Sequence, residues 1–419
     1  MKKHLTLLVI ATLCAIALYA GVGVNLTHAA AGDIYNLGTL GGSQSLGFDI
    51  NNTGQVTGNS YTTAEAEKHA FRYDGTPGGG GAMFDLGTLG GGESTGNAIN
   101  AAGQVAGDSY TSYTLEEDAA LHAFRYTGTP GSGGAMADLG TLGGGESTGR
   151  DINAAGQVVG DADTIGGVRH AYRTAPNAVI NPVTDDLGTL GGTTSIGIGI
   201  NDAGQVAGAS DTLGDAAVHA FRYSGTPGSG GAMVDLGTLG GTISVGTDIN
   251  AAGQVAGASD TLGDAAVHAF RYSGTPGSGG AMVDLGTLGG TISTGIDINE
   301  AGFVVGYARR SAGTDVWATL WQIDAGNTAV DLDAWLDATN PTLGAFWTLT
   351  VALGINDNGL ITGYGFYDDG AGGLIDQRAY ILDASSLVVP EPATLALLAF
   401  GLPLIMWRDL RRSGTSMAV

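Results

Sequence analysis

The sequence predicts an all-β fold, a seven-bladed β-propeller built from four-stranded repeats of about 49 residues. Three recurring motifs predict it. Leu-Gly-Thr-Leu-Gly-Gly occurs six times, with a degenerate seventh copy around Leu332, and Ile-Asn-x-x-Gly occurs seven times. His-Ala-aromatic-Arg occurs five times and then decays to WATLW at residues 317–321 and RAYIL at residues 378–382. Because these residues return once per repeat, they indicate architecture, whereas catalysis needs a single constellation.

The three motifs keep a constant order along the chain. The hexapeptides begin at Leu37, Leu86, Leu139, Leu187, Leu236 and Leu285. The asparagines of the second motif are Asn51, Asn100, Asn153, Asn201, Asn250, Asn299 and Asn356. The histidines of the third motif are His69, His122, His170, His219 and His268. Residues 203–244 and 252–293 are identical, as a recent tandem duplication would leave them.

Each repeat is expected to contain four short strands. In order, examples are STGIDIN (293–299), QVAG (254–257), HAFRY (268–272) and MVDLGTL (282–288), with alternating apolar residues and glycine boundaries. The first two strands are joined by Asn-x-x-Gly, which suits a type I turn. The Asn side chain can bond its own backbone two residues on, and Gly takes the positive φ that closes the hairpin. No segment shows a persistent helical period.

The ends of the repeat region predict how the fold closes. The region starts with a lone fourth strand at residues 35–40 and stops after a third strand at 378–382. The N-terminal strand should therefore complete the seventh repeat and remove a free sheet edge. The first strand of each repeat should lie nearest the axis, where crowding favours small residues. These are Gly47, Gly96, Gly149, Gly197, Gly246, Gly295 and Ala352. The alternative fold is an open β-solenoid, which needs terminal caps that the sequence does not show.

The two termini predict export. Residues 1–30 have Lys2 and Lys3, an apolar stretch and small residues near a cleavage site, as in a secretory signal peptide that would remove the single Cys14. The repeats span 33–384, a linker spans 385–392, and a short apolar helix with an arginine cluster spans 393–412, followed by a tail at 413–419. The apolar run of 15 residues is short against the roughly 20 that span a bilayer. The arginines would lie on the cytoplasmic side.

The C-terminal segment resembles the PEP-CTERM sorting signal of Gram-negative bacteria. The residues that carry the resemblance are Val389, Pro390, Glu391, Pro392, Arg408, Arg411 and Arg412. The resemblance implies recognition by an exosortase-type enzyme, cleavage near the Pro-Glu-Pro box, and delivery to the cell surface or its exopolysaccharide. Asp409 within the basic cluster is a departure from the pattern.

The repeats resemble the HAF family of extracellular repeats, named for the His-Ala-Phe at His69, Ala70 and Phe71 and its copies. The resemblance covers residues 33–383 and implies a repeat architecture without an established biochemical activity. It leaves the function open.

Charge excludes one class of partner. The chain has 40 acidic against 16 basic residues and a net charge of −24, so nucleic acid is not expected as a partner. The repeated histidines are expected to bond across neighbouring strands. The repeated arginines are expected to pair with acidic loop residues, and these are Arg72, Arg125, Arg173, Arg222 and Arg271.

Aspartates are the only candidate metal ligands. Asp49, Asp151, Asp248 and Asp297 precede the Ile-Asn pair on the predicted axial strand, while Ala98, Gly199 and Gly354 interrupt the ring. Acidic loops at 161–167, 211–215, 260–264 and 368–373 could offer further oxygens to calcium. None has the EF-hand spacing, and solvated acidic loops are the alternative. No other cofactor is expected.

Aromatic residues mark the candidate ligand site. Trp317, Trp321, Trp335 and Trp347 all lie close to the seventh repeat. Tryptophans can form platforms for sugars, and a repacked closing repeat is the alternative. No nucleophile elbow or HExxH pair is present. The sequence therefore favours a non-enzymatic interaction or structural module at the surface, with a carbohydrate-binding or carbohydrate-active propeller as the alternative.

Overall fold

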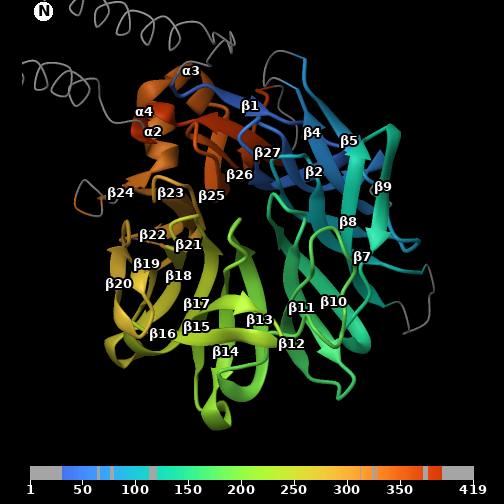
Figure 1. Cartoon of the computed structure of the whole chain (residues 1–419). Coiled ribbons are helices and arrows are strands. Elements are labelled where there is room, and N and C mark those ends of the chain that lie inside the picture. The colour runs from blue at the N-terminus through green and yellow to red at the C-terminus, as the bar shows by residue number, and fades with distance from the viewer. Residues whose placement is uncertain are drawn as a thin grey trace, which may run out of the picture.

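The fold is seen in a computed structural model that describes residues 31–63, 67–75, 80–112, 120–311, 313–322, 326, 328–370 and 376–388. The expected signal peptide and the sorting segment from residue 389 onward lie outside these residues. The described chain is all-β, and its consecutive strands pair antiparallel in groups that we call units 1 to 7. Figure 1 shows the units following one another around a common centre, from blue through green and yellow to red.

The strands of each unit follow the chain order. Unit 1 contains β2 (Gly41–Ile50), β3 (Val56–Thr62), β4 (Lys68–Asp74) and β5 (Ala82–Asp85). Unit 2 contains β6 (Ser94–Ile99), β7 (Val105–Tyr110), β8 (Leu121–Thr129) and β9 (Ser132–Asp138). Unit 3 contains β10 (Gly143–Ile152), β11 (Val158–Thr164) and β12 (Arg169–Arg173). Unit 4 contains β13 (Gly191–Ile200), β14 (Val206–Thr212), β15 (Val218–Thr226) and β16 (Ser229–Gly237).

The later units repeat this order. Unit 5 contains β17 (Gly240–Ile249), β18 (Val255–Thr261), β19 (Val267–Thr275) and β20 (Ser278–Gly286). Unit 6 contains β21 (Gly289–Ile298), β22 (Val304–Arg310), β23 (Val316–Gln322) and β24 (Thr328–Asp331). Unit 7 contains β25 (Trp347–Ile355), β26 (Leu360–Tyr367) and β27 (Asp376–Asp383). Single parallel bridges between β15 and β17 and between β19 and β21 join units 4 to 6 into one continuous sheet.

The N-terminal strand completes the last unit, as the ends of the repeat region predict. Strand β1 (Ile34–Asn36) pairs antiparallel with β27, with Ile34 opposite Leu382. Leu37 then packs with Ala379 and Ile381 of unit 7 and with core residues of unit 1. The two ends of the described chain are therefore held in one sheet.

Unit 3 departs from the predicted four strands. Its fourth strand is reduced to a single bridge between Tyr172 and Asp186, because residues 175–185 form turns. Pro182 lies in this stretch, and proline has no N–H for a ladder.

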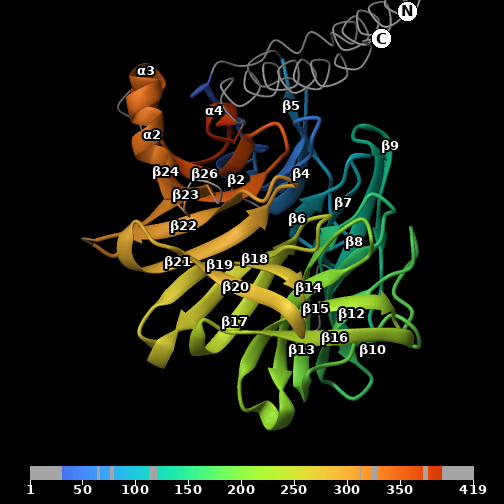
Figure 2. The same cartoon turned by 60° about the vertical axis from the view of Figure 1, so that its left-hand side comes forward.

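The expectation of no helical segment is wrong between units 6 and 7. Here α2 (Leu332–Thr339) and α3 (Pro341–Gly344) replace the hexapeptide connection. The Asp331 carboxylate caps α2 by accepting from the N–H of Ala334, and Leu332 and Leu336 bury one face of the helix. Figure 2 shows both helices standing out beyond the sheets. A last short helix, α4 (Ser385–Val388), follows β27.

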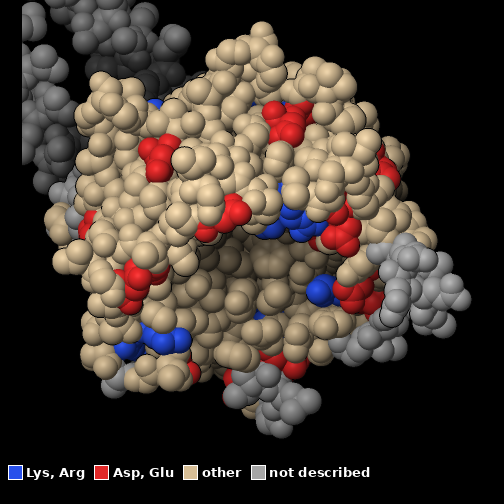
Figure 3. Space-filling view, turned by 90° about the horizontal axis from the view of Figure 1, so that it is seen from below, with Lys and Arg blue, Asp and Glu red and all other residues tan. Residues whose placement is uncertain are grey.

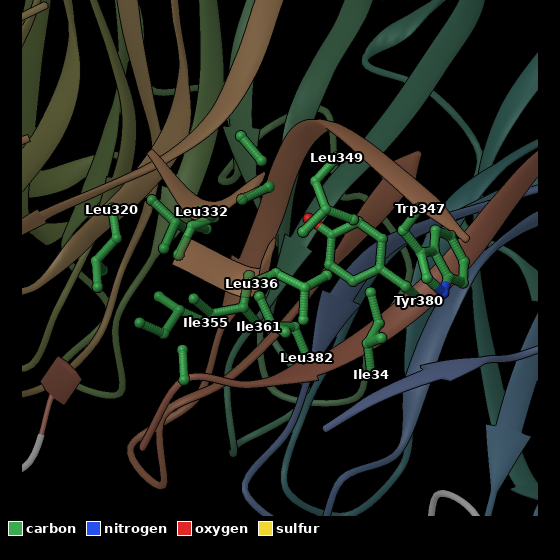
Figure 4. Packing of buried hydrophobic residues seen from close by; sticks show 14 of the residues in the cluster. Ile34, Leu320, Leu332, Leu336, Trp347, Leu349, Ile355, Ile361, Tyr380 and Leu382 are labelled. Carbon is green, nitrogen blue, oxygen red and sulfur yellow. The ribbon is translucent and has the colours of Figure 1, made fainter. Parts of the chain in front are cut away.

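The hydrophobic core lies mainly between neighbouring units. In one typical cluster, Val159 and Ala171 of unit 3 pack with Ile200, Val206 and Phe221 of unit 4. A cluster of the same kind joins unit 7 to unit 1. The largest cluster surrounds α2, β25, β26 and β27, and its labelled residues include Trp347, Tyr380 and Leu336 (Figure 4).

The small residues of the first strand have a more specific cause than crowding at an axis. They lie against the second strand of the preceding unit: a Cβ on Gly96 would lie 2.3 Å from Thr57 Oγ1, and one on Gly149 would lie 2.8 Å from the carbonyl oxygen of Gly107. These contacts set the close approach of neighbouring units.

Candidate functional site

The predicted axial aspartates line a single cavity of about 350 Å³. Each first strand carries a β-bulge, which in unit 1 falls between Gly47 and Asp49. A bulge re-aims the neighbouring side chains. All seven bulge residues line the cavity, and they are Phe48, Asn97, Arg150, Ile198, Thr247, Ile296 and Leu353. The cavity wall is therefore mixed, with apolar, acidic and one basic side chain.

Three of the aspartates bridge adjacent units through both carboxylate oxygens. Asp49 accepts the N–H of Ile50 in its own unit at 2.6 Å and the N–H of Ile99 in the next unit at 2.7 Å. Asp151 accepts in the same way from Ile152 and Ile200, and Asp297 from Ile298 and Ile355. These carboxylates therefore join neighbouring units.

Two of the three positions that lack aspartate, both glycines, have little space for one. A Cβ on Gly199 would lie 2.7 Å from Asp248 Cα, and one on Gly354 would lie 3.0 Å from Asp49 Cα. The next units' backbones fill the space that a side chain would need.

Asp248 differs from the other three. It accepts the N–H of Ile298 in the next unit at 3.1 Å, and Asp297 accepts the same N–H at 2.7 Å. A side-chain hydrogen bond joins the two carboxyl groups. Burial, followed by the charge of Asp297, raises the pKa of Asp248 well above its ordinary value. When it is protonated, Asp248 can donate this hydrogen bond to Asp297.

Burial also raises the pKa values of the other axial aspartates. The pKa of Asp49 and that of Asp151 rise to about 7, and the pKa of Asp297 rises to about 6. The amide donors oppose this rise because they stabilise the charged form. Near neutral pH the cavity therefore carries less negative charge than four ordinary aspartates would.

Calcium binding stays a prediction. The carboxylate oxygens already accept amide N–H groups, and the raised pKa values weaken the charge that attracts a cation. The acidic loops are also engaged, since Asp211 accepts from Thr194 and Asp215 accepts from Thr193. Within the described residues, no group of three or more His, Cys, Asp or Glu side chains is arranged to hold a metal ion.

The asparagines of the repeats link the units, which the turn interpretation missed. As expected, Asn153 Oδ1 accepts the N–H of Ala155 two residues on, and Gly156 N–H bonds to Asn153 O. In addition, the Nδ2 group of each asparagine donates to the backbone carbonyl of the asparagine in the next unit. The donors, in order, are Asn51, Asn100, Asn153, Asn201, Asn250, Asn299 and Asn356, and the last donates to Asn51 at 3.0 Å. The sequence did contain a sign of this role, a glutamine four residues after most of these asparagines. Its side chain accepts a hydrogen bond from the same Nδ2 group, as Gln205 does from Asn201.

The repeated histidines bond across neighbouring strands, as expected. His69 Nδ1 lies 2.9 Å from Asp85, which also accepts the N–H of Gly87 in the hexapeptide. The hydrogen bond to Asp85 raises the pKa of His69. Burial raises the pKa of Asp85, but the hydrogen bond from His69 and other contacts outweigh it, so the pKa of Asp85 is lowered. The equivalent pairs are His122–Asp138, His170–Asp186, His219–Asp235 and His268–Asp284.

The expectation for the arginines is wrong in most units. Arg72 does pair with a nearby acidic residue, Asp74, at 2.8 Å. Arg125, Arg173 and Arg222 donate to backbone carbonyls of the following unit. Such a carbonyl accepts from a buried guanidinium in place of a carboxylate, so these side chains also contribute to the contact between units.

The four tryptophans do not form one exposed platform. Trp321 is fully buried because it occupies the core position of the repeat's tyrosine, and Trp347 is 7% exposed beneath Tyr380 and Tyr367. These two cannot stack on a ligand. Trp317 is half-buried under the Arg310 guanidinium at 3.5 Å, and Trp335 packs on the core around α2. The ligand-site prediction stays only for Trp317 and Trp335.

Residues 388–412 match the PEP-CTERM protein-sorting motif. The match confirms the sequence interpretation of the tail, and it implies an exported protein that an exosortase-type enzyme processes at the membrane. Within the described residues, no helix has the length and apolar character needed to cross a membrane. The expected sorting helix lies outside these residues.

Comparison with curated proteins and with solved structures does not identify a function. No curated protein matches the chain. Among solved structures, the chain is similar to TolB from Acinetobacter baumannii, with 15% identity and a TM-score of 0.42 over 70% of this chain. The chain spans 63% of the length of that structure. The resemblance to HAF repeats stays a prediction.

Proposed function

We propose that this protein is a closed, seven-bladed β-propeller that is exported, sorted by an exosortase, and used outside the cell as a non-enzymatic interaction or structural module. The observation that supports a closed ring of seven is the asparagine ladder, which passes from unit to unit and returns from Asn356 to Asn51. The pairing of β1 with β27 supports the same closure.

The use of the repeated polar residues supports a non-enzymatic role. Each recurring asparagine, histidine and axial aspartate bonds to a neighbouring strand or unit, so these groups are engaged in holding the fold. After transient anchoring in the inner membrane, the protein would reach the cell surface or extracellular matrix of a Gram-negative bacterium. There it would contact exopolysaccharide or surface proteins.

The sorting step is tested at the Pro-Glu-Pro box. Replacing Pro390, Glu391 and Pro392 with alanine should leave the apolar helix in the membrane, because burial contributes about 1.5–3 kcal/mol per large side chain. The full-length chain should then accumulate in the inner membrane and vanish from the surface fraction. Alanines at residues 413–415 are the control and should mature normally. Normal surface delivery of the first variant with its tail removed would overturn the sorting role.

The axial cavity favours one alternative, a carbohydrate-active enzyme. Carboxyl groups with raised pKa values in a cavity suit general acid catalysis, and Asp248 and Asp297 are such a pair. A glycan-cleavage screen on the mature protein separates the two functions. Turnover that disappears in Asp297→Asn, with the melting temperature retained, would replace the module by an enzyme.

A further inference from the structure

We infer that the loops joining the second and third strands of units 3 to 5 form a docking surface for a cationic polypeptide that also carries aliphatic side chains. This inference rests on the proposed role as an interaction module. The loops carry Ile165, Leu213 and Leu262, which are 92%, 80% and 81% exposed, and we call these three residues the aliphatic arc. Each lies beside the first glycine of its unit's Gly-Gly pair, which are Gly143, Gly191 and Gly240.

The loops of units 4 and 5 hold their leucines in a fixed geometry. Leu213 begins the short 3-10 turn η2 (Leu213–Asp215), and Leu262 begins the equivalent η3 (Leu262–Asp264). The Asp215 carboxylate accepts both the N–H and the Oγ1 hydroxyl of Thr193, at 2.6 and 2.7 Å, and Asp264 accepts the same pair from Thr242. A leucine held exposed on a pinned loop loses little freedom when it is covered, which favours binding.

Charge around the arc selects the partner. The loops at 211–217 and 260–266 contain four aspartates and no lysine or arginine. Figure 3 shows acidic side chains, together with several basic ones, around a central hollow on the face seen from below. A cationic partner would therefore be attracted, whereas a second copy of this chain, at a net charge of −24, would be repelled.

The position of the tail argues against the membrane as the occupant. Helix α4 packs on the asparagine-turn end of unit 7, where Ala384 N–H bonds to Gly359 O and Gln322 Nε2 donates to Leu387 O. The aliphatic arc lies at the other end of the same kind of strand, because Thr212 pairs with Gly191 at the start of β13 and Asn201 follows its end. A ten-residue strand separates these ends by about 30 Å.

The link from the folded body to the expected apolar helix is short. Four residues separate Val388 from Ala393, and the five Cα–Cα steps between them span at most about 18 Å. While the chain is anchored, the end of α4 therefore stays within about 18 Å of the expected helix, and the arc lies at the opposite end of the strands. A polypeptide outside the membrane is the occupant that fits, and the two identical loops can engage it together.

The test uses the mature chain purified from the surface of the producing cells. The probes are fluorescent 14-residue peptides in which leucine alternates with lysine, leucine with glutamate, or serine with lysine. We expect the leucine–lysine peptide to bind at least tenfold more tightly than either of the others. The double variant Leu213→Ser, Leu262→Ser should lose at least tenfold of that affinity.

Val183→Ser is the matched control, because Val183 is 85% exposed in the turn segment of unit 3, outside the three loops. Its affinity should equal that of the parent. Equal binding by the double variant, or equal affinity for the glutamate peptide, would overturn the inference. Binding of neutral vesicles or polysaccharide that depends on the two leucines would also overturn it. Surface delivery and melting temperature are recorded for each variant, so a failure of the proposed function is seen separately.

Discussion

The axial aspartates, with pKa values raised by burial, predict how stability depends on pH. The axial aspartates have pKa values raised from 3.8 to about 6 or 7 on folding. A group whose pKa is raised in this way binds its proton more tightly in the folded state. Its contribution to stability is therefore fully present below about pH 4 and is lost as the pH rises through about 7.

The substitution Asp248→Asn should remove part of the stability that is lost as the pH rises. The amide NH₂ can donate to Asp297 as the protonated acid does, so the variant should melt with the parent at pH 5 and about 2 °C or more above it at pH 8. Asp151→Asn is the control. A pKa of about 7 leaves Asp151 mostly protonated at pH 5, where its hydroxyl oxygen can still accept a backbone N–H. An amide NH₂ would instead face that donor and cost about 1–3 kcal/mol. Equal losses in both variants at pH 5 would contradict the hydrogen bond from Asp248 to Asp297, as measured by calorimetry.

The asparagine ladder gives a second prediction at this scale. Asn201→Asp keeps the oxygen that accepts the N–H of Gln205 but loses the bond from Nδ2 to Asn250 O. Asn250 O would keep only the N–H of Gly253, and a carboxylate oxygen would face it in place of the donor, so the free energy of unfolding should fall by about 1–3 kcal/mol. Asn36→Asp, at an exposed asparagine that accepts the N–H of Gly38, should change little. Urea unfolding measures the free energy of unfolding of both variants. If the two variants are equally stable, the asparagine ladder does not stabilise the contacts between units.

At the scale of the element, the sequence predicts the strands and turns because each repeat supplies the same hydrophobic and glycine pattern. The helices α2 and α3 were missed because the segment around Leu332 resembles a seventh hexapeptide. Asp331, Leu332 and Leu336 were the available signal, since they have the spacing of a helix cap and an apolar face. Contacts between units, such as those of Arg222, could not be predicted because they join residues whose proximity only the ring creates.

The closing strand yields the prediction for this scale. Deleting residues 33–42 removes β1 and leaves the outer edge of β27 without its partner. It also removes Ile34 and Leu37 from the core. The truncated protein should aggregate or melt many degrees lower, because an open edge invites pairing between chains. Sedimentation and thermal unfolding measure this. A truncated chain that stays monomeric and melts like the parent would rule out this role for β1.

At the scale of the whole molecule, the net charge of −24 makes calcium a natural test. If the axial and loop aspartates bind calcium, millimolar calcium should raise the melting temperature, and at 100 times the dissociation constant the gain is about 2.7 kcal/mol. Magnesium at equal concentration controls for general screening of charge. A melting curve that calcium leaves unchanged would assign these residues to cohesion between units alone.

The bridging carboxylates also make the proposed ring sensitive to whether its number of units is odd or even. Asp49 serves units 1 and 2, Asp151 serves 3 and 4, and Asp297 serves 6 and 7. Seven units cannot all be grouped in pairs, so unit 5 is left without a pair. Its Asp248 lies next to unit 6, which already has Asp297. Units 5 and 6 are thus adjacent and both carry an aspartate. Removing either of them would leave six positions in which aspartate alternates with alanine or glycine. The identical residues 203–244 and 252–293 lie at this point of the chain, so the adjacent Asp248 and Asp297 lie where the alternation breaks.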